Sequence, residues 1–299
     1  MNDITFNTPD VSSNVSLATS ACLVMWNVSQ WTARKKDQRA ASKLAADNNA
    51  SSAALSVHKR LVNMPEFDAI NKHVGWVRNN FHYPQTLPWS DSGMRLVPTA
   101  DLFTYKPEME KHGQEFDRLV NEFLAVYADA VQRGRAQLGA MFDESQYPSV
   151  DEVASKFSWR TTFIPVPTSG DFRVDVSDIQ RENLAAEYED FYQAEMKSAM
   201  DGIWSDLHVA LSELVTKLDF DGKKKNKLFA SRLDSIKQLI RLLDSCNFTN
   251  DPKMSKMQRQ LASTFDGLTV EQLRHSEVMR ERTMGSLEDA LAKMPSLDF

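Results

Sequence analysis

The residues with the clearest potential for binding chemistry lie in one basic and aromatic block near the N-terminus. Trp31 opens this block, which continues with Arg34, Lys35, Lys36, Arg39 and Lys43. Cationic side chains beside aromatic rings suit single-stranded nucleic acid or an acidic protein surface. The alternative interpretation is a solvated turn of a helix that follows core tryptophans, which is the commoner outcome for a run of charges. The block is therefore a hypothetical partner-binding site.

A second candidate segment spans residues 86–99. It contains two prolines and a Ser-Asp-Ser-Gly turn between short apolar stretches, which is typical of a hairpin or an ordered loop. Trp89 and Arg95 from this segment complete the predicted partner-binding set. His82 lies nearby and is the histidine best placed for a pocket, although a histidine bonded to a loop carbonyl is more common. The sequence leaves open whether the segment forms a pocket.

The local sequence patterns of catalytic and metal sites are missing. The six histidines are scattered, and none has the close spacing to His, Cys or Glu of a zinc site. The glycine-rich phosphate loop, the dinucleotide-binding motif and the nucleophile elbow are also absent. We therefore predict no catalytic, cofactor-binding or metal-ligating residue, and a protein that is not an enzyme. A site built from dispersed residues would leave no such pattern.

Composition predicts a helical protein of the cytoplasm. A chain of 299 residues can bury a core without disulfides or metals, and its 10 glycines are few for a turn-rich β protein. The net charge of −6 argues against a surface wholly devoted to nucleic acid but permits a local basic patch. Cys22 and Cys246 lie far apart, which suits two buried thiols in a reducing compartment. No secretory signal opens the chain and no run of ~18 apolar residues occurs, so we expect no membrane contact.

The N-terminal half is predicted to combine helices with a small antiparallel sheet. Residues 1–16 are polar and aperiodic, which indicates a flexible arm. The predicted β segments are a buried strand at 17–31, the hairpin at 86–99, an edge strand at 157–167 and a further strand at 171–176. The predicted helices cover 33–46, 53–63, 65–81, 116–142 and 149–156, with Pro65 opening the third and Ser149 capping the last.

The C-terminal half is predicted to be entirely helical. One unbroken helix should run from residue 177 to 220, with a coiled-coil seam formed by Trp204, Leu207, Leu211, Leu214 and Leu218. A lysine-rich turn at 222–227 follows, and then comes a matching apolar stripe of Leu228, Leu233, Ile236, Ile240 and Leu243. The two stripes predict an antiparallel helical hairpin. Two further helices are expected at 251–265 and 269–293.

These elements predict a mainly α fold with a minor antiparallel β element in the N-terminal half. The expected organisation is a flexible arm (1–16), an α+β domain (17–176) and a helical domain (177–299). A helix of some forty residues spans about 60 Å, which is longer than one globular core usually needs. We therefore expect part of its apolar face to lie against another subunit.

Four sequence blocks resemble a family of uncharacterised proteins encoded by tailed bacteriophages and prophages. The blocks are NVSQWTARKKDQRA, TLPWSDSGMRLVPTADLFTY, YPSVDEVASKF and PVPTSGDFRVDV, and they cover about Trp26 to Val176. The family has no settled activity, so the resemblance assigns no catalytic residue. It implies a phage origin and an action in the cytoplasm of the infected bacterial host cell.

The leading functional expectation is a non-enzymatic protein that self-associates and occludes a host protein complex, such as a defence system. The first alternative is an accessory of DNA metabolism that binds single-stranded DNA through residues 26–43. The second alternative is a structural or assembly component of the virion. The expected partners are thus further copies of the chain and a host or phage protein complex, or nucleic acid in the first alternative, with no cofactor.

Overall fold

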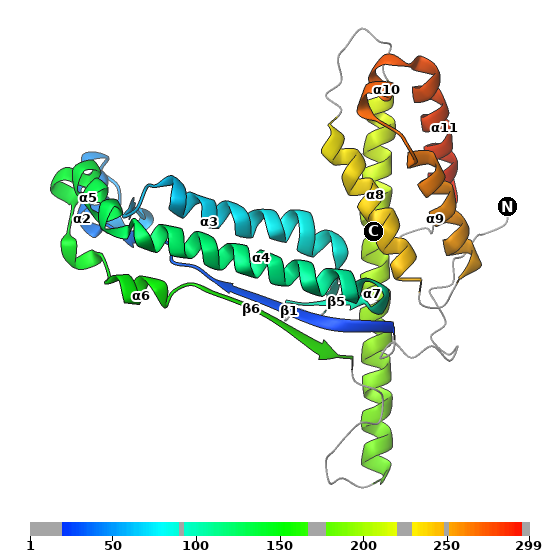
Figure 1. The fold of residues 1–299 in the computed structure, drawn as a ribbon, viewed down its shortest axis with the longest axis horizontal. Helices are drawn as coiled ribbons and strands as arrows, with labels where there is room; N and C mark the ends of the chain where they lie inside the picture. The colour runs from blue at the N-terminus through cyan, green and yellow to red at the C-terminus, as the bar shows by residue number, and fades with distance from the viewer. Residues whose placement is uncertain (1–19, 90–92, 167–177, 220–228, 248–250, 295–299) are drawn as a thin grey trace. The chain divides into compact units, whose positions relative to one another are not determined.

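The computed structural model describes residues 20–89, 93–166, 178–219, 229–247 and 251–294 (Figure 1). Helices account for most of these residues, and the strands form a small antiparallel sheet and a separate two-stranded ribbon. The predicted mainly α fold with a minor β element is confirmed. Two compact units are present: a first unit of residues 1–25, 80–105 and 162–299, and a second unit of residues 26–79 and 106–161.

The antiparallel sheet has the strand order β4-β5-β1-β6. Its strands are β1 (Ala21–Ser29), β4 (Leu87–Trp89), β5 (Met94–Pro98) and β6 (Ser158–Pro165). Leu96 of β5 lies opposite Leu23 of β1 on one side and Leu87 of β4 on the other, and all three side chains are buried. The predicted buried strand, the hairpin and the edge strand are therefore confirmed.

The predicted helical hairpin is also confirmed, in the first unit. α7 (Asp178–Leu218) and α8 (Ala230–Ser245) lie side by side and run in opposite directions (Figure 1). The predicted seam of α7 is buried from Trp204 to Leu218, and it belongs to the same core as Leu233, Ile236, Ile240 and Leu243 of α8. α9 (Pro252–Phe265), α10 (Val270–His275) and α11 (Glu277–Ala292) complete this core.

The last predicted helix, at 269–293, is divided in two. Ser276 separates α10 from α11 with an extended backbone, and its hydroxyl accepts a hydrogen bond from the Met279 amide at the start of α11. A serine side chain at this position satisfies an amide that the first turn of a helix otherwise leaves without a partner. The segment is therefore helical, as its periodicity predicted, but the prediction of one continuous helix was wrong.

The second unit contains α2 (Gln38–Asp47) and four further helices: α3 (Pro65–Trp76), α4 (Thr99–Ala125, which begins in the first unit), α5 (Tyr127–Leu138) and α6 (Val150–Ala154). Its core includes Trp31, Phe67, Phe123, Tyr127 and Val153. The stripe predicted for 116–142 is buried at Phe116, Leu119, Val120, Phe123, Tyr127 and Ala130, although Val126 breaks the helix. A short π-helical turn (Val77–His82) and a 3-10 turn (Tyr83–Gln85) follow α3.

Two predicted helix starts in this unit are confirmed. Pro65 occupies the first turn of α3, where the missing amide hydrogen is not needed. Ser149 caps α6, and its side chain and that of Glu152 each accept a hydrogen bond from the other residue's backbone amide. This reciprocal pair is the capping box.

The helix predicted at 33–46 is confirmed from Gln38 onward, whereas its first residues and the helix predicted at 53–63 were wrong. Residues 34–36 form strand β2 (Arg34–Lys36), which pairs with β3 (His58–Arg60), so that helix α2 (Gln38–Asp47) begins only at Gln38. A 3-10 turn (Ser52–Ala54) replaces the start of the second predicted helix. Ala33 has a positive φ of 49°, which ends any helix and costs an alanine about 1–2 kcal/mol. Pairing between distant segments has overridden the helix propensity of Arg and Lys.

The arm at 1–16, the strand at 171–176 and the turn at 222–227 lie outside the described residues. Whether 17–176 and 177–299 fold as separate domains stays a prediction. Among the described residues, no helix combines the length and the hydropathy needed to cross a membrane.

Candidate functional site

The two tryptophans of the predicted partner-binding set are core residues. Trp31 is 9% exposed, and its ring lies 6.0 Å from that of Phe67 and 5.9 Å from that of Tyr127. Trp89 is 1% exposed and stacks on Tyr192 with ring centres 5.8 Å apart. Neither indole offers a face on which a nucleic-acid base could stack. Both are core residues, which agrees with the alternative interpretation for Trp31.

Arg95 stabilises the hairpin rather than an open binding surface. Its Nε donates a hydrogen bond to the Thr86 hydroxyl at 2.5 Å, and its Nη2 donates to the Thr86 carbonyl at 2.6 Å. The guanidinium carbon lies 4.6 Å from the centre of the Tyr83 ring. Burial lowers the pKa of this guanidinium below its ordinary value. These contacts tie β5 to the segment that precedes β4.

The remaining predicted residues are exposed and gain cationic neighbours that sequence reasoning missed. Strand β3 carries a His-Lys-Arg run and lies antiparallel to β2 in the register Arg34↔Arg60, Lys35↔Lys59 and Lys36↔His58. We call this two-stranded element the cationic ribbon. The run at 58–60 is visible in the sequence, but the helix predicted for 53–63 concealed its pairing with 34–36.

The cationic ribbon has two unlike faces, because directly opposite residues of a strand pair point to the same side. One face holds Lys35, which is exposed, and Lys59, which is 8% exposed and donates a hydrogen bond to the Met141 carbonyl at 2.7 Å. The other, which we call the outer face, holds Arg34, Lys36, His58 and Arg60, all exposed. The ribbon is thus anchored on one side and open on the other.

Backbone hydrogen bonds and Asp37 fix the two ends of the ribbon. The Leu61 amide donates to the Ala33 carbonyl at 2.8 Å, and the Asp37 amide donates to the Val57 carbonyl at the same distance. The Asp37 carboxylate accepts from the Ala40 amide at 2.9 Å, which caps α2, and lies 3.9 Å from Lys59 Nζ. The Asp37 carboxylate is therefore engaged with the anchored face.

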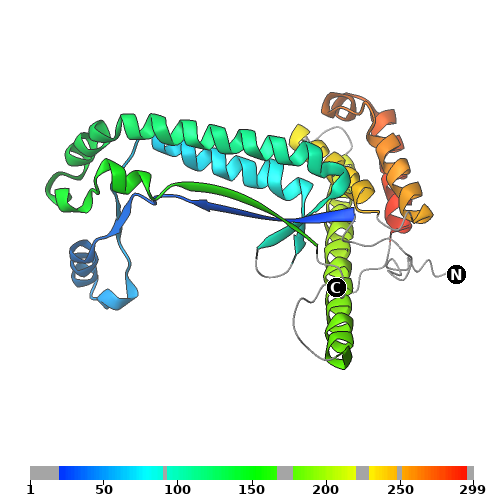
Figure 2. The same ribbon diagram turned by 60° about the horizontal axis from the view of Figure 1, so that its bottom comes forward.

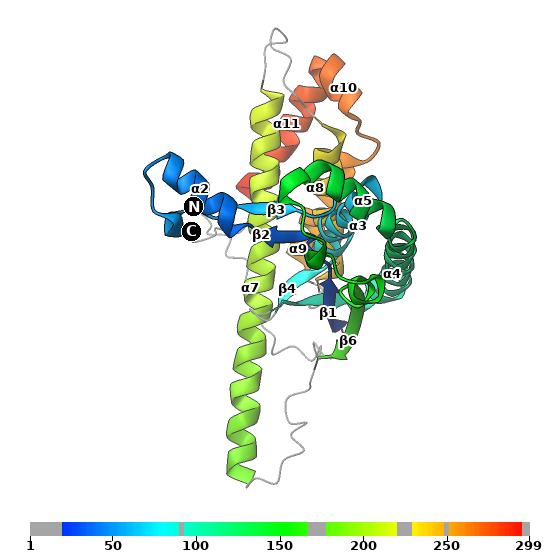
Figure 3. The same ribbon diagram turned by 90° about the vertical axis from the view of Figure 1, so that its left-hand side faces the viewer.

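The outer face and the adjoining helix carry positive charge that is not neutralised. In the described part of the chain, Arg34, Lys36 and Arg60 form no ion pair with a carboxylate, and neither do Arg39 and Lys43 of α2. Figure 2 shows the blue segment with α2 standing apart from α3 and α4, and Figure 3 labels β2, β3 and α2 side by side. Like charges placed directly opposite each other destabilise a strand pair. An anionic partner would relieve this repulsion.

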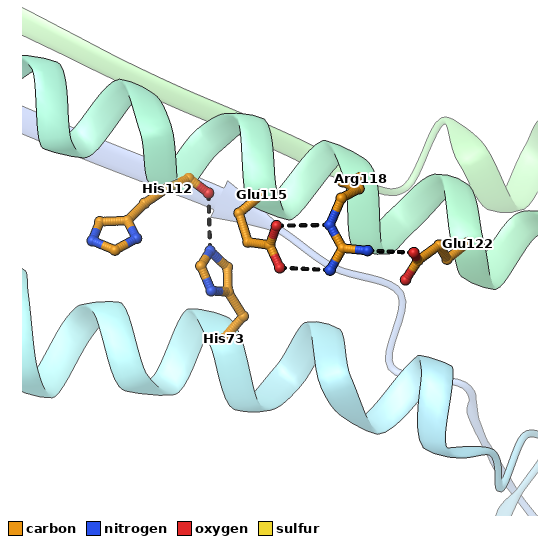
Figure 4. Close-up of polar contacts among 5 residues, drawn as sticks. All are labelled: His73, His112, Glu115, Arg118 and Glu122. Atoms are coloured by element: carbon orange, nitrogen blue, oxygen red, sulfur yellow. Dashed lines mark hydrogen bonds and ion pairs between the residues drawn. The ribbon is translucent and has the colours of Figure 1, made fainter.

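A histidine pair on α3 and α4 is the second cluster with titratable groups (Figure 4). His73 Nε2 lies 2.9 Å from the backbone carbonyl oxygen of His112, and the His73 ring stacks on Trp159 with centres 6.1 Å apart. Burial, followed by the neighbouring His73, lowers the pKa of His112. Both rings are engaged in packing two helices, which is a structural role.

The charged residues that follow on α4 form a surface network. Arg118 makes hydrogen bonds to both carboxylate oxygens of Glu115 and also pairs with Glu122 (Figure 4). These pairs are three and four residues apart on one exposed helix face, where each stabilises the helix only slightly. They do not converge on a cavity.

His82, the histidine best placed for a pocket, is buried and bonded. Its Nδ1 lies 2.6 Å from the Tyr105 hydroxyl, and its backbone carbonyl accepts a hydrogen bond from the Thr86 hydroxyl at 2.6 Å. Burial raises the pKa of Tyr105 well above its ordinary value. The Tyr105 hydroxyl therefore stays protonated and serves as a buried hydrogen-bond partner of His82.

A polar hollow of about 390 Å³ lies over α9, α10 and α11. Its lining includes Thr264 and Ser286, whose hydroxyl oxygens are 2.6 Å apart and bonded to each other. No cluster of three or more His, Cys, Asp or Glu side chains suited to a metal ion occurs in the described ranges. The lining of the hollow also includes the charged residues Asp266 and Arg282.

Comparison with known proteins gives no match: no protein-family model, no curated protein and no solved structure matches this chain. The site must accordingly be interpreted from its own chemistry.

Proposed function

We propose that this protein is a non-enzymatic accessory of DNA metabolism that binds nucleic acid through the cationic ribbon. The observation that supports this proposal is the outer face, where Arg34, Lys36 and Arg60 are exposed and form no ion pair with a carboxylate among the described residues. Phosphate backbones bind such surfaces because neutralising them releases condensed counterions.

The distribution of charge along the chain supports a dedicated binding surface. The whole protein has a net charge of −6, yet residues 26–79 contain nine Lys and Arg against four Asp and Glu. A basic region on an acidic protein attracts polyanions locally, while the rest of the surface limits non-specific adhesion. Because Trp31 is buried, charge is the main expected contribution.

The test is a titration of fluorescently labelled DNA with the full-length protein, followed by anisotropy at several salt concentrations. The logarithm of the binding constant should fall linearly with the logarithm of salt concentration. Reversing Arg34, Lys36 and Arg60 to glutamate should weaken binding at least tenfold and reduce the salt slope by roughly one per lost phosphate contact.

The matched control reverses three exposed cations elsewhere, Lys72, Arg133 and Arg241. It changes the net charge by the same amount but leaves the ribbon intact, so it should bind DNA nearly as well as the parent. Equal losses in the two variants would show that only overall charge matters, and would contradict a ribbon site.

A second candidate function is favoured by α7 and concerns protein partners. Tyr188 and Phe191 in its N-terminal part are 40% and 46% exposed, and their rings contact Tyr192 at 6.0 and 5.6 Å. Exposed aromatic clusters are typical of the centres of protein interfaces. We propose self-association through this segment, which would support occlusion of a host protein complex, and the sequence resemblance supports an action inside an infected bacterial cell.

Sedimentation of the purified protein tests this second proposal. The parent should form a dimer or larger species at micromolar concentration, and Tyr188→Ser with Phe191→Ser should shift it to the monomer. Val209→Ser, at an α7 side chain that is 48% exposed, is the control and should leave the assembly unchanged. A parent protein that is monomeric at ~100 μM would exclude self-association as a working state.

A further inference from the structure

If the cationic ribbon binds nucleic acid, as proposed above, its shape and charge indicate which form of nucleic acid it binds. Proteins that bind single strands combine a basic groove with aromatic rings on which bases stack. The aromatic residue nearest the ribbon in sequence, Trp31, is only 9% exposed. Trp76 is 53% exposed, but it lies eleven residues beyond the start of α3, roughly 16 Å along the helix axis. Neither tryptophan therefore gives the ribbon a stacking platform.

The shape of the ribbon favours a duplex. A two-stranded β-ribbon fits into the major groove of B-DNA, which is about 12 Å wide and is bordered by two phosphate backbones. Neighbouring strands are about 4.8 Å apart, and residues two positions apart on one strand are about 6.8 Å apart. Arg34 and Lys36 extend from β2, while Arg60 and His58 extend from β3. The long cationic side chains of the two strands are thus suited to contact the two phosphate backbones that border one groove.

Helix α2 extends this surface beyond the ribbon. Only Asp37 separates β2 from α2, so the helix begins where the ribbon ends. Arg39 and Lys43 are four residues apart and exposed, whereas Ala41 and Ala45 are buried on the packed side. Residues at this spacing share one helix face. The two cations can therefore contact phosphates that flank the groove occupied by the ribbon.

The backbone at the start of the ribbon is strained at one residue. Ala33, at the base of β2, has a left-handed φ of 49° although it is not glycine, and its carbonyl accepts the hydrogen bond from Leu61. Strained residues persist where the surrounding structure requires them, often at functional sites. Ala33 redirects the chain from the core residue Trp31 into the exposed strand.

We propose that the cationic ribbon binds double-stranded DNA in its major groove, with Arg34 and Lys36 on one phosphate backbone, Arg60 and His58 on the other, and α2 on the flanking phosphates. Contacts to phosphates fix position but carry no sequence information, and three residues per strand leave little length for base contacts. Binding is therefore largely independent of sequence.

The experiment compares a 20-base-pair duplex with the corresponding 20-nucleotide single strand, using the full-length protein at matched salt. We expect the duplex to bind at least fivefold more tightly. Methyl green, which occupies the major groove, should displace the protein, whereas netropsin, which occupies the minor groove, should not. Arg34→Gln with Arg60→Gln should weaken duplex binding at least fivefold, and the Lys72→Gln with Arg133→Gln control should not.

The possible results distinguish binding to duplex DNA from nucleic-acid binding in general. Tighter or equal binding of the single strand, or displacement by netropsin alone, would overturn the duplex assignment while leaving nucleic-acid binding intact. Failure to bind either DNA above the level of the Arg34→Gln, Arg60→Gln variant would overturn both. Binding of polyglutamate as tightly as the duplex would identify an acidic protein as the partner and would also overturn both.

Discussion

Arg34 and Arg60 lie directly opposite each other across β2 and β3, so two guanidinium-bearing residues face one another on an exposed strand pair. In an antiparallel pair such residues have Cβ atoms about 5 Å apart. A pair selected only for stability would place an acid at one of the two positions. The arrangement thus lowers the stability of the strand pair but increases the positive electrostatic potential of the outer face.

The repulsion between these residues should be measurable without any ligand. Arg60→Gln is expected to raise the free energy of unfolding by about 0.2–1 kcal/mol at low salt, because it removes a like-charged cross-strand pair. The gain should shrink in 1 M salt, where charges are screened within about 3 Å. Urea denaturation at the two salt concentrations measures both effects. A variant less stable than the parent at low salt would contradict the assigned register.

Lys59 and Lys35 provide a matched comparison, because they face each other but differ in burial. Lys59→Met removes the hydrogen bond to the Met141 carbonyl and the contact with Asp37, and should lower the free energy of unfolding by about 1–3 kcal/mol. Lys35→Met alters an exposed side chain and should change it by less than about 0.5 kcal/mol. Urea denaturation should separate the two variants clearly. Similar effects would show that Lys59 is not an anchor.

Gly134 tests close packing at the base of the ribbon, and Gly202 of α7 is its control. A methyl group at Gly134 would lie 2.8 Å from the Leu61 carbonyl oxygen and would collide with the Tyr147 hydroxyl, so Gly134→Ala should destabilise the protein by about 1–3 kcal/mol. A methyl at Gly202 of α7 meets open space, so Gly202→Ala should stabilise by about 0.5–1 kcal/mol. Thermal unfolding curves give both signs, and a stabilised Gly134→Ala protein would refute the packing.

His112 predicts a dependence of stability on pH. Because burial lowers the pKa of this histidine, the unfolded chain binds its proton more readily than the folded protein does. The contribution of neutral His112 to the free energy of unfolding is fully present above the unfolded pKa of about 6.5 and is lost as pH falls below it. His112→Gln should therefore reduce the loss of stability between pH 7 and pH 5.5. His275→Gln, at an exposed site, is the control and should retain the full loss.

The parts of the fold that the sequence predicted are those set by local periodicity and capping. The spacing of Trp204, Leu207 and Leu211 identified the buried face of α7, and Ser149 with Glu152 identified the start of α6. In both cases the determining residues are separated by only a few positions. Local spacing of this kind is enough to specify one face or one end of a helix.

The candidate site was only half predictable, for a physical reason. Arg34, Lys35 and Lys36 stood out as a charged run, but their strand partners lie more than twenty residues further along the chain. Arg and Lys are good helix formers, so propensity favoured a helix where distant pairing produced a strand. The left-handed Ala33 gave no signal, because this conformation is normally associated with glycine. The burial of Trp31 and Trp89 likewise depends on tertiary packing.

The strand order β4-β5-β1-β6 has a consequence for how the chain is made. β1 ends at Ser29 and its neighbour β6 begins at Ser158, so roughly 130 residues are synthesised between them. At about 5–20 residues per second, the ribosome needs some 6–26 s to deliver the second strand. During that interval the edge of β1 that later pairs with β6 presents unpaired backbone N–H and C=O groups to other chains. Nascent protein should therefore depend on holding chaperones until translation has passed Pro165.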